Sequence, residues 1–217
     1  NDVVPELLKI IVDPKKPPAI QLRLIPALLS VDHSKNVVHQ IIASIAPKLP
    51  SKKEEKRKIG QQSLTELVKT LSKDDYFILF QDLRNFLKEG RQIPVLFISL
   101  NNMLVNAVNG QGSFDSFITL FSDVLLEDIF GYMGEMRKQK GSEIPEAKKC
   151  MSFDSFKYLA KYVTFKPTSR DLIDSILNKF KTLRTIDQSK GARRIILFIS
   201  QGFVDNETGD AETLGNT

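Results

Sequence analysis

Apolar residues recur along most of the chain at the spacing of an amphipathic α-helix. In segment after segment they stand at positions i, i+3, i+4 and i+7, which gathers them on one face of a helix. Alternation of apolar and polar residues, which is typical of a half-buried strand, is almost absent. The pattern predicts about ten helices and hence an all-α fold.

Residues with known preferences for helix ends divide the chain further. Ser34 is a predicted N-cap for a helix whose apolar face runs from Val37 to Ile45, because its hydroxyl can accept a hydrogen bond from a free backbone N–H. Gly90 and Gly110 follow other apolar stripes and are predicted helix stops. The segment from Glu135 to Cys150 is polar and contains a glycine and a proline, so we expect an exposed loop there.

A short internal repeat supports a regular architecture. The pentapeptide Ser-Phe-Asp-Ser-Phe occurs at 113–117 and again at 152–156, an offset of 39 residues. At each copy we expect the serine to cap a helix, the aspartate to face the positive end of the helix dipole and both phenylalanines to enter the core. About ten helices in this length correspond to one helical hairpin per roughly 40 residues, which is the period of stacked helix pairs.

Two segments, Val4–Ile11 and Gln21–Leu29, make the chain similar to the HEAT and armadillo class of α-helical repeats. The resemblance implies an α-solenoid of about ten helices in antiparallel pairs, with a concave face that binds other macromolecules. It transfers no catalytic residue. We expect a single repeat domain over residues 1–204, which is part of a longer chain, and an acidic, disordered tail over 205–217.

The composition is that of a soluble globular chain, with 41% hydrophobic and 26% charged residues. The longest apolar run, Ile195–Ile199, is too short to cross a bilayer. The single cysteine, Cys150, cannot form a disulfide within the chain, which fits a reducing compartment. We therefore expect no membrane association and a cytoplasmic or nuclear location.

The charge is unevenly distributed. The net charge is +5, but residues 205–217 contain four acidic and no basic residues, so the preceding part carries +9. Lysines and arginines gather in three stretches of that part, and such clusters can bind phosphates or acidic peptides. The candidate partner-binding or nucleic-acid-binding residues are Lys52, Lys53, Lys56, Arg57, Lys58, Arg137, Lys138, Lys140, Lys157, Lys161, Arg193 and Arg194.

Residue patterns that would carry chemistry are missing from the sequence. His33 and His39 have no third metal ligand nearby, and no glycine-rich phosphate-binding loop follows a predicted strand. Cys150 would need a lowered pKa to act as a nucleophile, and its neighbours Lys148 and Lys149 lie in a predicted flexible loop, so we interpret it as a buried or incidental cysteine. The acidic residues Glu127 and Asp128 are interpreted as part of a solvated face. We expect no catalytic residue, no cofactor, no metal and no small-molecule substrate.

Two functional hypotheses follow. The first is a non-enzymatic helical scaffold that binds other proteins, for example an acidic or extended peptide, within a larger complex. The alternative is an RNA-binding or DNA-binding solenoid that acts in RNA metabolism or ribosome assembly, in which case the basic clusters share one face. The phenylalanine stripes are interpreted as core packing. The last apolar helix, Ile195–Phe203, suggests self-association or contact with a partner.

Overall fold

The computed structural model describes residues 3–13, 15–140 and 145–209, and within these ranges it contains helices and connecting segments but no strand. The all-α fold is therefore confirmed. The α-helices are α1 (Val3–Val12), α2 (Pro18–Val31), α3 (Lys35–Ile45), α4 (Glu54–Thr70), α5 (Tyr76–Phe86), α6 (Ile93–Asn106), α7 (Ile118–Phe130), α8 (Tyr132–Lys140), α9 (Ser152–Tyr162), α10 (Phe165–Phe180) and α11 (Ile186–Val204).

The contacts group the chain into two compact units, residues 1–109 and residues 110–217. The first unit contains α1 to α6 and the second contains α7 to α11. Each has its own buried apolar core. The single repeat domain expected over residues 1–204 stays a prediction.

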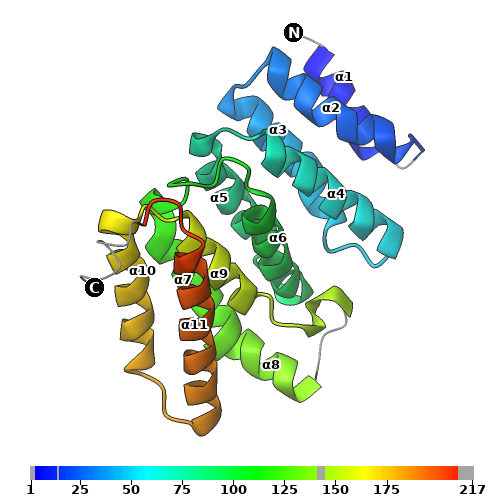
Figure 1. The fold of residues 1–217 in the computed structure, drawn as a ribbon. Coiled ribbons are helices and arrows are strands. Elements are labelled where there is room, and N and C mark those ends of the chain that lie inside the picture. Colours follow the sequence, from blue (N-terminus) through cyan, green and yellow to red (C-terminus); the bar gives the residue numbers. More distant parts are fainter. Residues whose placement is uncertain (1–2, 14, 141–144, 210–217) are drawn as a thin grey trace. The chain divides into compact units, whose positions relative to one another are not determined.

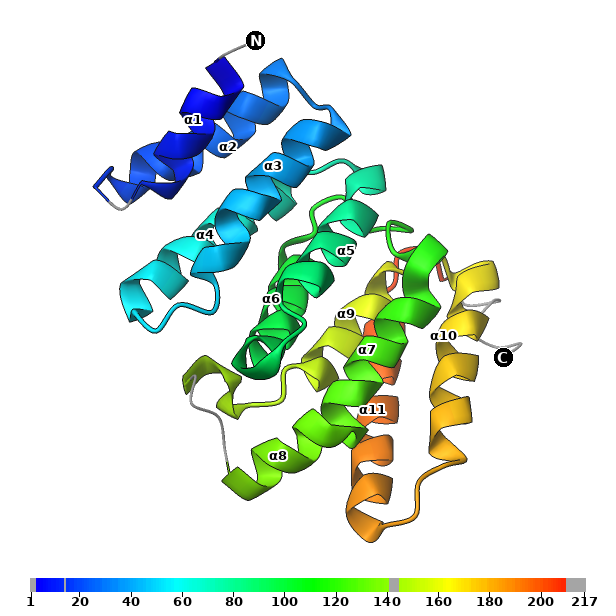
Figure 2. The ribbon, with the colours of Figure 1, turned by 180° about the vertical axis from the view of Figure 1, so that it is seen from behind.

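The first unit is a two-layered stack of three helical hairpins. Helices α1, α3 and α5 contact one another in succession, and so do α2, α4 and α6. Figure 1 shows the layer of α2, α4 and α6 from its own side, and Figure 2 shows the layer of α1, α3 and α5. Stacking of this kind buries an apolar face that no single hairpin can bury, and it is compatible with an α-solenoid.

Helix α3 shows how the sequence produces this packing. Val37, Val38, Ile41, Ile42 and Ile45 are all buried, as their spacing predicts. The Ser34 hydroxyl accepts a hydrogen bond from the backbone N–H of Val37 at 3.4 Å, which confirms the predicted N-cap.

In the second unit, helix α7 contacts α8, α9 and α10, and α9 packs along α11 (Figure 2). The crossing of α9 and α11 depends on a glycine. A Cβ atom at Gly202 would overlap the carbonyl oxygen of Lys157 and lie 2.7 Å from the Cβ of Ala160. Only the absence of a side chain lets the two helix backbones approach this closely.

In the repeated pentapeptide, the predicted burial of the phenylalanines is confirmed, but the predicted capping by the serines is not. Phe114, Phe117, Phe153 and Phe156 are buried, as expected of core residues. The expected serine caps are wrong, because η4 (Asp115–Phe117) and α9 start without a side-chain cap hydrogen bond. The polar groups of the repeat bind residues far away in the sequence instead: the Ser152 hydroxyl donates a hydrogen bond to Asp128, and the Asp115 carboxylate accepts one from the Thr164 N–H. The two copies share sequence but not local structure.

The prediction of a loop over Glu135–Cys150 is wrong for residues 135–140. Residues 135–140 continue α8, and 145–148 form a short 3-10 helix, while 141–144 lie outside the described residues. Gly131 lies between α7 and α8, where a Cβ would overlap the Glu127 carboxylate. The chain bends at Gly131 and then continues as a helix of residues that favour helical structure despite their polarity.

Residues 205–209, which fall in the expected tail, pack against α9 and α10. The Asn206 side-chain amide donates hydrogen bonds to the carbonyl oxygens of Ala160 and Val163, both at 2.8 Å, and thereby satisfies free carbonyls at the end of α9. The Thr208 hydroxyl accepts a hydrogen bond from the Phe165 N–H at 2.9 Å. Residues 210–217 lie outside the described residues.

Candidate nucleic-acid and partner interface

The basic cluster of the first unit surrounds the start of α4. Lys52, Lys53 and Lys56 are exposed, and within the described residues none of the three forms an ion pair. Lys58 is also exposed, and its ammonium contacts the Glu54 carboxylate at 2.8 Å. Three of the five predicted residues in this cluster are thus available to an anionic partner.

Arg57 has a structural role in the same cluster. Its guanidinium donates hydrogen bonds to the carbonyl oxygens of Ser51 and Lys52, both at 3.1 Å, and so braces the turn before α4. Lys48 donates to the carbonyl oxygen of Ile11 at 3.0 Å. The pKa of Lys48 lies below its ordinary value, chiefly because burial penalises the charged ammonium and secondarily because Lys56 repels it.

The basic residues of the second unit differ in their surroundings. Lys157 pairs with Asp205 at 3.4 Å, and the Lys161 ammonium lies 5.5 Å from the centroid of the Tyr162 ring. Arg193 and Arg194 are exposed on α11. The side chains of Lys138 and Lys140 lie outside the described residues. The first cluster belongs to one unit and the others to the second, and a shared face stays a prediction.

Arg137 belongs to a buried polar network. Asp128 is 0% exposed and accepts hydrogen bonds from the Ser152 hydroxyl at 2.6 Å and from the Arg137 guanidinium. Arg137 also donates to the Asp128 backbone carbonyl at 3.3 Å. The expected solvated position of Asp128 is wrong, because Arg137, nine residues away in α8, compensates its charge inside the core and Ser152 of α9 donates a hydrogen bond to it.

Cys150 completes this network as a neutral thiol. Its Sγ donates a hydrogen bond to the Asp128 carboxylate at 3.2 Å. Burial, followed by repulsion from the Asp128 charge, raises the pKa of Cys150 to about 12. The thiolate is the nucleophilic form, so this environment suppresses the reactivity of the cysteine.

A cavity of about 260 Å³ lies beside the network, among α7, α8, α9 and the first turns of α11. Its size is below that of a typical drug-sized ligand site. Cations and apolar side chains line it together. The principal lining residues are Ile129, Phe130, Arg137, Phe153, Lys190 and Arg194.

The cavity brings together two residues that the sequence analysis nominated from separate stretches, Arg137 and Arg194. Two further residues of the cavity, Lys190 and Phe153, are not among the candidates predicted from the sequence. Lys190 stands at its edge, and Phe153 presents its ring to the Arg194 guanidinium, with 4.2 Å between the guanidinium carbon and the ring centroid. Phe153 and Arg194 are distant in sequence, so their contact cannot be predicted from periodicity or spacing.

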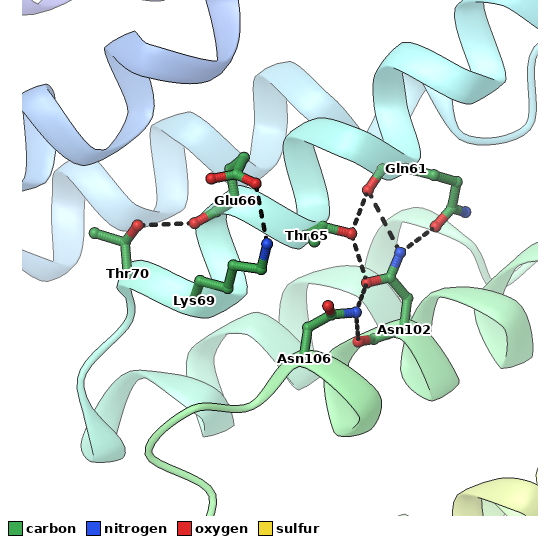
Figure 3. A network of polar contacts seen from close by, with 7 residues as sticks. All are labelled: Gln61, Thr65, Glu66, Lys69, Thr70, Asn102 and Asn106. Atoms are coloured by element: carbon green, nitrogen blue, oxygen red, sulfur yellow. Dashed lines mark hydrogen bonds and ion pairs between the residues drawn. The ribbon is translucent and has the colours of Figure 1, made fainter.

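A second polar arrangement lies between α4 and α6 of the first unit (Figure 3). The Asn102 amide donates to the Gln61 side-chain oxygen at 3.0 Å, and the Thr65 hydroxyl donates to the Asn102 side-chain oxygen at 3.0 Å. Asn106 donates to the same Asn102 oxygen at 3.0 Å. These half-buried neutral groups satisfy one another, so they join the two helices and leave little chemistry for a ligand.

Residues 3–13, 15–140 and 145–209 contain no group of three or more histidine, cysteine, aspartate or glutamate side chains that could hold a metal ion. In the same ranges, no helix is long and apolar enough to span a bilayer.

Fold and surface together define a helical scaffold with basic patches. The family model of the U3 small nucleolar RNA-associated protein 20 domain matches residues 18–215, and the chain belongs to this family. It is 26% identical over 178 residues to U3 small nucleolar RNA-associated protein 20 of Schizosaccharomyces pombe, which covers 78% of the chain and 7% of that protein. The protein of the same name from Saccharomyces cerevisiae is 26% identical over 140 residues, 63% of the chain and 6% of that protein. The chain therefore spans less than a tenth of the length of these relatives.

Proposed function

We propose that the chain is a non-enzymatic helical segment, of the HEAT-like or armadillo-like repeat type, that binds RNA within a larger RNA–protein assembly in the nucleus. The RNA metabolism or ribosome assembly hypothesis is thus preferred over a scaffold that binds proteins alone. Family membership carries this preference, since the relatives are named for their association with a small nucleolar RNA.

The surface chemistry supports the same proposal. Lys52, Lys53 and Lys56 are exposed next to one another at the start of α4, where ion pairs with the described residues do not neutralise them. Clustered lysines of this kind bind the phosphates of nucleic acids and release counterions as they do so. Arg57 supports the turn that presents them.

The test is the affinity of the 217-residue chain for a fluorescent single-stranded RNA of about 20 nucleotides, measured by anisotropy at several salt concentrations between about 50 and 200 mM. The triple variant Lys52→Gln, Lys53→Gln, Lys56→Gln removes three positive charges. We expect the slope of log affinity against log salt to become shallower by about 2, since each phosphate contact to a single strand contributes about 0.7.

A matched control removes three charges elsewhere. Lys9→Gln, Lys69→Gln and Lys181→Gln change lysines that already contact Glu6, Glu66 and Asn178. This variant should keep the salt slope within the error of the wild-type measurement. Absence of RNA binding at the lowest salt concentration, or equal loss in both triple variants, contradicts the proposal.

Protein contacts through α11 form a second, compatible prediction. Ile196, Leu197 and Val204 are 52%, 56% and 82% exposed, so this helix presents several large apolar side chains to solvent. Self-association through this helix would cover them. Sedimentation velocity at micromolar concentration, on the wild-type chain and on Leu197→Gln, measures whether the chain dimerises and whether this helix is responsible.

A further inference from the structure

The cavity of the second unit combines features of a stacking site. Its apolar wall contains Ile129, Phe130 and Phe153, and the cations Lys190 and Arg194 lie on α11. Its volume of about 260 Å³ is below the range for drug-sized ligands and suits a single planar group rather than a whole cofactor.

The Arg194 guanidinium lies close to two aromatic rings. Its guanidinium carbon lies 4.2 Å from the Phe153 ring centroid and 5.5 Å from that of Phe198. The side chain is exposed, and within the described ranges it forms no ion pair. Arginine guanidinium groups beside aromatic rings also stack on nucleobases.

Gly191 keeps the cavity open. It stands inside helix α11, where glycine is less favourable than alanine by roughly 0.5–1 kcal/mol. A Cβ atom at this position would lie 3.0 Å from Cε1 of Phe130, so even the smallest side chain would press on the cavity wall. A larger side chain at this position would occupy the space itself.

The charges around the opening are moderate. Lys190 contacts Asp187 at 3.2 Å, and the charge of Arg137 is compensated by Asp128. Arg194 therefore supplies the uncompensated positive charge of the lining. This suits a ligand with one phosphate next to a planar apolar group better than a strongly acidic peptide, which would need several unpaired cations.

We infer that this cavity receives one unpaired base of a single-stranded RNA, with the Arg194 guanidinium stacked on the base and its uncompensated charge close to the neighbouring phosphate. The inference rests on the proposed function and specifies its ligand as an unpaired nucleotide. A phosphate-only contact would not need the apolar wall, and a double-stranded RNA would not offer a free base.

The experiment uses the 217-residue chain and four substitutions, read by anisotropy with three probes: a labelled single-stranded RNA of about 20 nucleotides, the same strand as a duplex, and an abasic strand of equal charge. Gly191→Leu fills the cavity, and Arg194→Gln removes the stacking cation. Arg194→Lys retains the charge but not the plane. Arg170→Gln is the control, because Arg170 is exposed on α10, contacts Asp174 and does not line the cavity.

We expect Gly191→Leu and Arg194→Gln to weaken binding of the single strand about fivefold or more, as loss of one base–aromatic stack does. Arg194→Lys should recover less than half of that loss on a logarithmic scale, and Arg170→Gln should stay within about twofold of wild type. Binding of the duplex and of the abasic strand should respond equally little to Gly191→Leu. Circular dichroism of each variant reports folding, and if Gly191→Leu does not fold, the two Arg194 variants decide.

Failure of the inference and failure of the proposed function give different results. If the wild-type chain binds RNA and only the lysine variant of α4 weakens it, the proposed function stands and the inference is overturned. If the wild-type chain binds no RNA at low salt, both are overturned. If an acidic peptide of ten residues with one central phenylalanine displaces RNA, and its binding is lost in Gly191→Leu, the occupant is a protein segment and the inference is wrong.

Discussion

A polar contact near the surface joins α3 to α5 in the first unit, whereas a carboxylate inside the core joins α7 to α8 and α9 in the second. In the first, His39 and Asp82 join α3 to α5 at 2.6 Å from an exposed position. In the second, Asp128 is fully enclosed and shared by Ser152, Cys150 and Arg137. Water can take the place of a lost partner in an exposed pair, but it cannot reach an enclosed charge. The two sites should therefore lose very different amounts of stability when one partner is removed.

The largest difference is expected between Asp128→Ala and Asp82→Ala. Removing Asp128 takes away the carboxylate that the Arg137 guanidinium, only 13% exposed, contacts in the core, together with the acceptor of the Ser152 and Cys150 hydrogen bonds, and should lower the free energy of unfolding of the second unit by about 3–5 kcal/mol. Removing Asp82 frees a histidine that is half exposed and should cost about 1 kcal/mol or less. Hydrogen exchange of amides in α7 and α3 measures each unit separately. Equal losses would contradict the comparison.

The second prediction concerns the thiol in the same network. Because the folded-state pKa of Cys150 is raised to about 12, the thiol stays protonated at pH 8, and alkylation by iodoacetamide should be about a thousandfold slower than in the urea-unfolded chain. The protonated thiol's contribution to the free energy of unfolding is present below the unfolded pKa near 9.0 and is lost as the pH rises from there to about 12. Asp128→Asn should accelerate alkylation of the folded chain, and an unchanged rate would exclude a contribution from the Asp128 charge.

Helix crossings give the third prediction. Gly202→Ala introduces a methyl group into space that the Lys157 carbonyl oxygen and the Ala160 Cβ occupy. It should destabilise the second unit by about 1–3 kcal/mol. At Gly60 in the first unit, a Cβ would lie 3.1 Å from the Lys48 Cβ, 3.2 Å from the Leu49 Cδ2 and 3.3 Å from the Leu49 backbone nitrogen, so the neighbours would have to shift by much less than at Gly202. Gly60→Ala should therefore remain within about 1 kcal/mol of wild type, since the gain in helix propensity offsets the contact. Urea unfolding followed by circular dichroism tests both variants.

The smallest expected effect lies in the neutral network between α4 and α6. Asn102→Ala removes hydrogen bonds to Gln61, Thr65 and Asn106 at a half-buried site, where water can replace the lost partners, and should cost about 1 kcal/mol. The surface pair of Glu66 and Lys69 provides the control, and Lys69→Gln should cost less than about 0.5 kcal/mol. A loss as large as that of Asp128→Ala would show that the first unit also depends on its polar contacts.

Much of the local structure is predictable from the sequence because helix periodicity is a local property. The apolar stripe from Val37 to Ile45 identifies α3, and Ser34 marks its start, since both depend on residues within one or two helical turns. The repeated pentapeptide predicts buried phenylalanines for the same reason. Its serine roles are not predictable, because the Ser152 hydroxyl turns from the helix end to Asp128, which is 24 residues away.

The candidate site is less predictable. Lys52, Lys53 and Lys56 can be nominated from local charge alone, and their exposure agrees with that reading. Phe153 and Arg194 come together only because α9 packs along α11. The burial of Asp128 similarly depends on α8 turning back to bring Arg137 beside it.

By itself, the sequence determined that the chain is helical, where most of its helices lie and which side chains enter the core, because spacing along 3.6 residues per turn and helix-end preferences act over a few residues. Only the tertiary structure decided which of the charged residues are enclosed, which helices form layers, and where a cavity remains. Those outcomes depend on close packing between segments that are far apart in the chain, such as Gly202 against Lys157, and no local pattern records such contacts.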